Sequence, residues 1–534
     1  MAQRSLWRRG LAGVLLFVPA MLTAQQTTAE RTGFQETSSY TDVLAFLRAL
    51  QHETTDIRVG TLARSTEGRD VPWVLVARPM VDGPIAAHAS GKPVVYLQGN
   101  IHAGEVEGKE VAQMLLRDLT IGPLRSLLDS VILLVVPIYN VDGNEKFGPG
   151  EEHRPGQNGP ARVGLRPNGQ GLDLNRDYIK MEAPETRGAA RLINRWDPDL
   201  FIDMHTTNGS YHGYQLTYSQ GLNPNDSAAN AYVRDEFLPL ARQRVRDRHG
   251  QEMFWYGNFR NQNPDSLDQG WFTYDARPRF GTNWFGMRGR MAILSEGYSN
   301  APFDVRVSAS YNFVSEILGL AAESRERILT IRGQVDSARP QFVAVRSQRA
   351  PPVTMDVIAE ITEPAADGAG PFAKRKRTGQ YRTIAMPVYY RFDPARVESI
   401  PAGYLFPPGL RPVAELLVRH GIRVQQIDQP WSGPVEAFTI DSLLAAGRPF
   451  QGHRVVSLVG RWRDDQSAAT PGWFYVETDQ RLGLLAAYVL EPLSADGVVT
   501  WNFLDRDLRR GRDYPVVRVR QPIRVAMLTL ETID

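Results

Sequence analysis

The sequence predicts an α/β protein with a mixed, mostly parallel central sheet and helices on both faces, followed by a smaller β-rich C-terminal domain. Between residues 35 and 335, strand-like apolar runs alternate with helical patterns, which is typical of a layered α/β sheet. The runs at 131–136, 200–202 and 291–294 are continuously apolar, as expected for strands covered on both faces. Beyond residue 340 the chain turns to short strand candidates and to segments rich in Pro, Ala and Gly.

These patterns divide the chain into four segments. Residues 1–24 are expected to be a signal peptide, because arginines precede an apolar run of 12 residues, Leu11 to Leu22, and the small residue Ala24 follows. The first α/β domain is expected over 35–335, linkers and loops over 340–380, and a β-rich accessory domain of unknown role over 381–534. Helices are expected over 105–119, 308–335 and 412–420.

Composition and the N-terminus limit location and partners. The signal peptide implies export to the periplasm or secretion, without stable membrane insertion, although a retained N-terminal anchor is the alternative. Lys and Arg total 61 against 59 acidic residues, so the charge gives no reason to expect nucleic acid or an anionic membrane as a partner. Because the chain contains no cysteine, any metal must be held by His and carboxylate groups.

Metal-ligand candidates follow two of the predicted strands. His102 and Glu105 stand in the turn after the strand at 94–97, and His205 follows the strand at 200–202. Two imidazoles and a carboxylate would leave a position open for water, as catalytic zinc requires, and Asp203 could orient an imidazole. Taken alone, each fragment is better explained by a Glu that complements a helix start or a His that ends a strand.

Three further fragments offer groups for substrate and catalysis. Asn175 and Arg176 are adjacent in a loop, where an amide and a guanidinium can hold a carboxylate. Arg166 could supply positive charge to a developing oxyanion. Glu296 ends the apolar strand at 291–294, where an acidic group must be paired or placed at a working site, and near a metal it could act as a general base.

The order of the motifs is more specific than any one of them. Along the chain come His102-Ala-Gly-Glu105, Asn140-Val-Asp-Gly143, Asp173-Leu-Asn-Arg176, His205 and Glu296. Together they resemble the zinc carboxypeptidase family, the carboxypeptidase A-like metallopeptidases, over residues 90–300. The resemblance implies a zinc carboxypeptidase-like fold, one zinc ion, and a peptide substrate with a free C-terminal carboxylate. It leaves the C-terminal third of the chain unexplained.

The resemblance also implies a role for each matched residue. The implied zinc ligands are His102, Glu105 and His205. Glu296 matches the general base. Asn175 and Arg176 match the pair that grips the substrate's C-terminal carboxylate.

Two implied roles remain open between several residues. Arg166 is the candidate for the arginine that polarises the scissile carbonyl, with Arg162 as a competitor. Tyr274 is the candidate for the tyrosine that closes on substrate, with Trp284 or Tyr256 as alternatives.

The predicted function is zinc-dependent hydrolysis of the C-terminal peptide bond. Two alternatives stay open. One is a zinc amidohydrolase of N-acyl amino acids, similar to the aspartoacylase and succinylglutamate desuccinylase group, which uses a comparable ligand set. The other is a secreted binding module whose metal site has decayed. The sequence does not fix the preferred C-terminal residue, exo- or endopeptidase action, or peptidoglycan against ordinary peptides.

Overall fold

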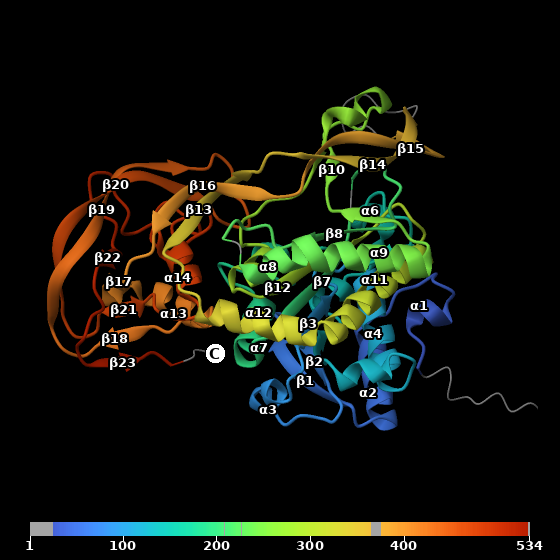
Figure 1. Ribbon diagram of the computed structural model, residues 1–534, viewed down its shortest axis with the longest axis horizontal. Coiled ribbons are helices and arrows are strands. Elements are labelled where there is room, and N and C mark those ends of the chain that lie inside the picture. Colours follow the sequence, from blue (N-terminus) through green and yellow to red (C-terminus); the bar gives the residue numbers. More distant parts are fainter. Residues whose placement is uncertain (1–24, 208, 226, 365–374, 532–534) are drawn as a thin grey trace, which may run out of the picture.

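The computed structural model describes residues 25–207, 209–225, 227–364 and 375–531. The predicted signal peptide over 1–24 lies outside these residues. An α/β region formed by the first part of the chain and a β-rich region formed by the C-terminal part lie side by side (Figure 1). None of the helices in the described ranges has both the length and the apolar character that a membrane crossing needs.

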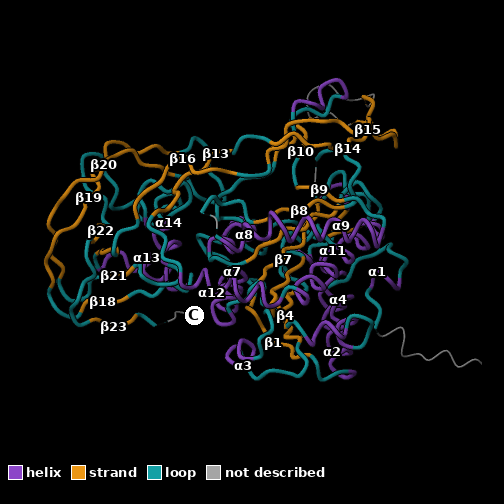
Figure 2. Tube along the Cα trace, in the orientation of Figure 1, coloured by secondary structure: helices purple, strands orange, loops and turns teal. Residues whose placement is uncertain are grey.

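An eight-stranded sheet forms the centre of the α/β region (Figure 2). Its strands, in spatial order, are β1 (Ile57–Arg64), β2 (Asp70–Val76), β4 (Ile132–Val136), β3 (Val94–Gly99), β7 (Leu200–Thr206), β12 (Met291–Gly297), β8 (Leu216–Gln220) and β9 (Met253–Trp255). Four of the seven neighbouring pairs are parallel, including those that join β4, β3, β7 and β12. All residues of these four strands are buried, which confirms the mixed, mostly parallel sheet.

Helices cover both faces of this sheet. The longer ones are α2 (Tyr40–Glu53), α4 (Glu107–Thr120), α7 (Pro184–Trp196), α9 (Leu238–His249), α10 (Gly281–Met287), α11 (Phe303–Glu323) and α12 (Arg325–Ser337). Phe201 of β7 stacks on Phe285 of α10. Met204 lies three residues further along β7, and therefore on the opposite face, where it packs against Gly108 of α4.

The expected helices match the structure with one exception. The predictions over 105–119 and 412–420 correspond to α4 and to α13 (Arg411–Arg419). The helix expected over 308–335 is instead two helices, α11 and α12, because the backbone of Ser324 between them leaves the helical region (φ −94°, ψ 15°). The short elements are α1 (Thr28–Arg31), α3 (Pro84–Ala89), α5 (Val141–Glu145), α6 (Gly150–His153), α8 (Ala228–Tyr232), β5 (Gly148–Pro149) and β6 (Arg162–Val163). Short 3₁₀ helices span Arg125–Asp129, Leu174–Arg176, Pro264–Gln269 and Pro408–Leu410, and a π-helical stretch, Val233–Phe237, joins α8 to α9.

The expectation of linkers and loops over 340–380 is wrong. Strand β13 (Phe342–Arg349) pairs with β16 (Phe392–Ser399), and β14 (Val353–Pro364) pairs with β15 (Arg375–Tyr389). Strand β15 also pairs with β11 (Trp271–Phe272), which in turn pairs with β10 (Asn258–Phe259). The strands β14 and β15 therefore extend the α/β region, whereas β13, with its partner β16, lies against α14 (Gly483–Leu490) of the C-terminal region. The Pro and Gly residues that suggested a linker stand just before β14 or between β14 and β15.

The C-terminal region is β-rich, as predicted, and also contains two helices, α13 and α14. Its seven-stranded sheet has the order β20 (Val456–Ala469), β19 (Trp431–Ala445), β22 (Val517–Val519), β17 (Gly403–Phe406), β21 (Phe474–Glu477), β18 (Gln425–Ile427) and β23 (Met527–Thr529). Every neighbouring pair in this sheet is antiparallel.

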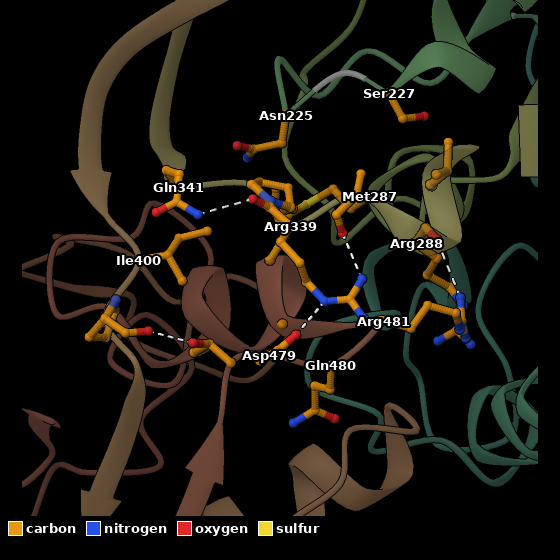
Figure 3. A pocket seen from close by; sticks show the side chains of 18 of the residues that line it. Asn225, Ser227, Met287, Arg288, Arg339, Gln341, Ile400, Asp479, Gln480 and Arg481 are labelled. Atoms are coloured by element: carbon orange, nitrogen blue, oxygen red, sulfur yellow. Dashed lines mark hydrogen bonds and ion pairs between the residues drawn. The ribbon is translucent and has the colours of Figure 1, made fainter. Parts of the chain in front are cut away.

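The two regions share a buried interface. Nε1 of Trp284 in α10 donates to Nδ1 of His420 at 3.0 Å, and both side chains are fully buried. A cavity of about 690 Å³ lies at the same junction, where Arg339 pairs with Asp479 (Figure 3). The C-terminal region is thus packed against the elements that carry the central sheet.

Candidate metal centre

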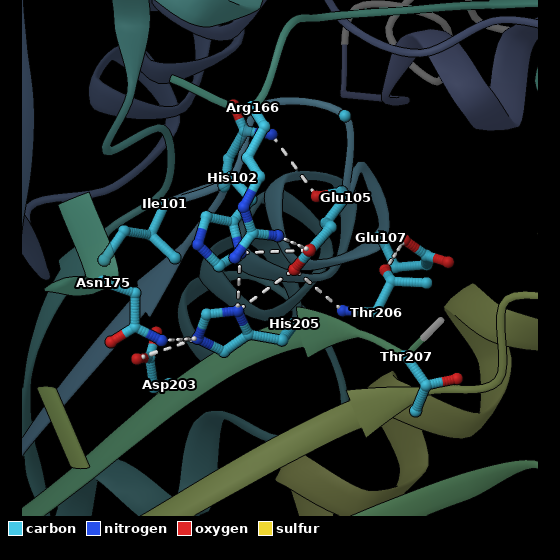
Figure 4. A network of polar contacts seen from close by, with 12 residues as sticks. Ile101, His102, Glu105, Glu107, Arg166, Asn175, Asp203, His205, Thr206 and Thr207 are labelled. Atoms are coloured by element: carbon cyan, nitrogen blue, oxygen red, sulfur yellow. Dashed lines mark hydrogen bonds and ion pairs between the residues drawn. The ribbon is translucent and has the colours of Figure 1, made fainter. Parts of the chain in front are cut away.

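The carboxyl ends of three neighbouring parallel strands bring the predicted site residues together (Figure 4). Strand β3 ends at Gly99, and the turn into α4 carries His102 and Glu105. Strand β7 carries His205, and its register partner in β12 is Glu296. Because parallel strands end at one edge of a sheet, residues that are distant in sequence meet there.

A tight turn after β3 aims His102 and Glu105 at one point. A Cβ on Gly99 would lie 2.6 Å from the backbone of Gly108, so only glycine permits the close approach of the strand to α4. Asn100 adopts a left-handed conformation (φ 64°), and its Nδ2 donates to the carbonyl oxygens of Ala103 and Glu105. The local sequence thus fixes the turn that carries two of the ligand candidates.

The three ligand candidates present their donor atoms to a common centre. Nδ1 of His102 lies 3.0 Å from Oε1 of Glu105, and Nδ1 of His205 lies 3.0 Å from Oε2 of the same carboxylate. The two Nδ1 atoms are 3.2 Å apart. One donor atom from each residue lies within 4.8 Å of the others, and all three side chains are buried.

The opposite ring nitrogens face carboxylates. Nε2 of His102 lies 3.0 Å from Oδ1 of Asp173, and Nε2 of His205 lies 2.9 Å from Oδ2 of Asp203. Such partners hold the proton on Nε2 and leave Nδ1 free to bind a metal. Two imidazole nitrogens and one carboxylate are a donor set that zinc accepts, with room for a further ligand. The residues therefore fit a catalytic zinc ion.

Two arginines surround the Glu105 carboxylate. Nη1 of Arg154 lies 3.2 Å from Oε1, and Nη1 of Arg166 lies 3.1 Å from the same atom. Burial alone would raise the pKa of Glu105, but His102 and Arg154 hold it well below its usual range. Sequence reasoning missed Arg154, because its loop carries no pattern that sets this arginine apart from many others.

The donor atoms open into a cavity of about 370 Å³. Its wall contains the ligand candidates and the other predicted groups, which are Arg166, Asn175, Arg176, Tyr274 and Glu296. It also contains residues that were not assigned a role from the sequence, among them Arg154, Phe280, Thr282 and Leu294. Glu296 is 8% exposed, and within the described residues its carboxylate has no hydrogen-bond or ion-pair partner. Burial, together with Glu105, raises the pKa of Glu296 to about 8, although His205 and the arginines oppose the shift.

Asn175 and Arg176 reach the same cavity on one side. The guanidinium of Arg176 lies over the Phe280 ring at 4.1 Å, which holds the planar group in one orientation. Oδ1 of Asn175 accepts a hydrogen bond from the backbone N of Gly281 at 2.9 Å, and its Nδ2 lies 3.2 Å from Nε2 of His205. Through its bond to Gly281, the Asn175 side chain therefore holds the start of α10 as well as lining the cavity.

The structure narrows the choice among the aromatic candidates. Tyr274 and Tyr256 both line the cavity, and their ring centroids are 5.6 Å apart. Trp284 is fully buried against His420 and does not line it, so this alternative is wrong.

The loop of Arg166 is fixed by the third matched motif. Nδ2 of Asn140 donates to the backbone oxygen of Arg166 at 3.0 Å, and Oδ1 of Asn140 caps α5 through the N–H of Gly143. Arg162, the competitor of Arg166, is exposed, donates to the backbone oxygen of Phe147 and does not line the cavity. Asn140 thus contributes to the site indirectly, because it holds the loop that carries Arg166.

Comparisons with known proteins found similar sequences and structures. Residues 43–263 match the family model described as zinc carboxypeptidase. Carboxypeptidase 2 of Trichophyton rubrum is 23% identical over 483 residues, covering 86% of this chain and 82% of that protein. Carboxypeptidase D of Homo sapiens is 26% identical over 325 residues, covering 54% of this chain and 22% of that protein. The solved metallo-carboxypeptidase from Burkholderia cenocepacia is 18% identical, with a TM-score of 0.41, over 54% of this chain and 70% of that one.

The family match spans His102, Glu105, the pair Asn175 and Arg176, and His205, and it ends before Glu296. Residues 43–263 of the chain are thus similar to the zinc carboxypeptidase family, and the matches support a zinc hydrolase.

Proposed function

We propose that the protein is a metallocarboxypeptidase that removes the C-terminal residue of peptides with a free carboxylate. The observation that carries the proposal is one cavity that joins three kinds of group. These are a His-Glu-His donor set, a carboxylate without a partner among the described residues, and an arginine whose guanidinium lies over an aromatic ring. Hydrolysis of a C-terminal peptide bond needs each of them.

His102, Glu105 and His205 would hold one zinc ion. When bound, zinc polarises a carbonyl group and lowers the pKa of a water to about 7. Asp173 and Asp203 lie within hydrogen-bond distance of Nε2 of the two imidazoles, which would keep the protons there and leave each Nδ1 available as a ligand atom. These contacts support the proposed metal-binding role of the three residues.

Glu296 would act as the general base. Its carboxylate accepts a proton from the attacking water and later passes that proton to the nitrogen of the departing amino acid. A buried position is suited to this role, because burial and the neighbouring Glu105 raise the pKa of Glu296 above its usual value and make its carboxylate a stronger base.

Two arginines would each bind a different negative charge, one the developing oxyanion and the other the C-terminal carboxylate of the substrate. Arg166, which is 35% exposed at the cavity wall, donates to Asp173 and Glu105, and part of its guanidinium remains free for the developing oxyanion. Arg176 would hold the C-terminal carboxylate with help from Asn175. Tyr274, in the same wall, would close over the bound residue.

The N-terminal sequence supports export. The arginine-rich start and short apolar run of residues 1–24 are those of a secretory signal, so we propose a periplasmic or secreted enzyme. Peptides outside the cytoplasm would then be its substrates.

The test compares three substrates at equal concentration with the zinc-loaded protein. They are an N-blocked peptide with a free C-terminus, the same peptide with a C-terminal amide, and N-acetylaspartate. Mass spectrometry of the products should show release of one C-terminal amino acid from the free acid alone. Cleavage of acetylaspartate without action on the peptide would instead support the N-acyl amino acid hydrolase alternative.

A further inference from the structure

The C-terminal region reaches the metal centre through a hairpin. Strands β19 and β20 are joined by residues 446–455, and this hairpin turn packs against the loop that carries Asp173. Oε1 of Gln451 accepts a hydrogen bond from the backbone N of Asp173 at 2.9 Å. A side chain 278 residues away in sequence is therefore directly bonded to the segment that borders the ligands.

Asp173 is the residue through which this contact can act. Its Oδ1 lies 3.0 Å from Nε2 of His102, and its Oδ2 accepts hydrogen bonds from Nε and Nη2 of Arg166. The position of one backbone thus sets the orientation of an imidazole ligand and of an arginine at the cavity wall. Gln451 fixes that backbone from the outside.

The backbone of Gln451 itself is unusual. Its φ is 51°, a left-handed conformation that costs free energy for a residue with a side chain and that surrounding contacts must hold in place. Glycine would adopt this conformation freely, and Gly452 follows immediately. A glutamine is present where the backbone favours glycine, which indicates that its side-chain hydrogen bond to Asp173 offsets the cost of this conformation.

Neighbouring contacts hold the hairpin turn at the site. Nε2 of His453 lies 2.8 Å from Oε1 of Glu182, and its Nδ1 lies 3.0 Å from Oδ1 of Asn502. The Phe450 ring lies 5.1 Å from the Arg279 guanidinium. The turn is fastened on both sides of Gln451.

A second link connects the C-terminal region with the side of the cavity where Arg176 lies. Arg279 forms a buried ion pair with Asp496, with Nη2 2.7 Å from Oδ1, and its backbone N donates to the same carboxylate. The next residue is Phe280, whose ring supports the guanidinium of Arg176. The C-terminal region therefore braces the cavity at two points.

We propose that Gln451 is a positioning residue of the active site, which holds Asp173 so that the His102 ring and the Arg166 guanidinium keep their working orientations. The inference rests on the proposed function for its catalytic consequence, but its effect on metal binding stands independently. The β-rich C-terminal region thereby supplies part of the catalytic apparatus.

The test uses the full chain with Gln451→Gly, Gln451→Ala and Gln451→Glu. Glycine removes the side chain and relaxes the backbone, so the hairpin keeps its shape. Glutamate keeps an oxygen that accepts the Asp173 N–H. The matched control is Gln466→Ala, at an exposed position of β20 outside this contact.

Two readouts are needed, zinc affinity by chelator competition and steady-state kinetics. Loss of an outer partner of a metal ligand weakens affinity about 10–100-fold, and Gln451 is one residue further out, so we expect about a threefold to tenfold loss for Gln451→Gly and Gln451→Ala. The kcat should fall more than KM changes. Gln451→Glu should recover most of both quantities, and Gln466→Ala should match the parent protein.

The outcomes are decisive in both directions. Zinc affinity and kcat within twofold of the parent for both Gln451→Gly and Gln451→Ala would overturn the inference. Equal defects in Gln466→Ala would also overturn it, because the effect would then belong to the hairpin as a whole. A weaker zinc affinity in a protein that hydrolyses no peptide would reject the proposed function and still support the positioning role.

Discussion

Replacing Glu296 by glutamine should remove the proposed general base without disturbing the fold or the metal ligands. The residue lies in β12 between β7 and β8, opposite His205 and Thr217, and these pairings use only its backbone. Within the described residues its carboxylate makes no hydrogen bond that the substitution would break. Glutamine has nearly the same shape, so Glu296→Gln should fold normally and bind zinc with unchanged affinity.

The magnitude follows from the role. General base catalysis contributes about 10²–10⁴-fold, which corresponds to a barrier increase of about 3–5 kcal/mol when it is lost. We expect kcat to fall by this factor while KM changes little, because the residues that hold the substrate carboxylate are untouched. Stopped assays that quantify the released amino acid over hours would cover this range.

The control for Glu296→Gln is Glu316→Gln, which changes another nearly buried carboxylate, one that pairs with Arg248 outside the cavity. Its kcat should stay within twofold of the parent. If Glu296→Gln kept a tenth or more of the parent kcat with zinc fully bound, the assignment of the base would be refuted.

Three further predictions test other parts of the site and the scaffold. Arg176→Lys loses the planar group that lies over Phe280, so kcat/KM on free-acid peptides should fall about 10–100-fold, mainly through KM, with little change on amidated peptides. A chelator should abolish hydrolysis, and zinc at about 1,000 times its Kd should restore it and stabilise the fold by about 4 kcal/mol, visible as a higher Tm. Burial raises the pKa of Glu185 to about 7, so its contribution to stability is complete below about pH 4.5 and is lost as the pH rises to 7. Glu185→Gln should therefore raise the free energy of unfolding by about 3 kcal/mol at pH 8 and leave it unchanged at pH 4, as urea titrations at the two pH values would show.

The site residues that could be predicted from the sequence are those that lie at the ends of buried strands. His205 and Glu296 follow continuous apolar runs, and such runs in an α/β pattern predict parallel strands that end at one edge. Their pairing in register is the reason that two residues 91 positions apart lie side by side. His102 and Glu105 were found for the same reason, since their turn directly follows β3.

Residues whose role depends only on tertiary contacts could not be identified from the sequence, because no local pattern marks them. Arg154 reaches Glu105 from a loop, and nothing in its neighbours distinguishes it from the other arginines of a chain rich in them. Strands β14 and β15 were missed because the Pro and Gly residues between and before them dominated the composition, while few of their side chains are buried. The choice between Arg166 and Arg162 also needed coordinates, because it depends on which loop faces the cavity.

No feature of the sequence indicated the contact between the two regions. The pattern changes near residue 340, and a change of pattern suggests separate units. Yet His420, in the C-terminal region, accepts from Trp284 and lies 3.0 Å from the backbone oxygen of Ile179 through its other nitrogen. Burial lowers the pKa of His420 to about 3, so the ring stays neutral and provides one acceptor and one donor for these two contacts. Because Trp284 lies in α10, which packs on the strands that carry His205 and Glu296, the C-terminal region supports the metal centre through a continuous buried contact.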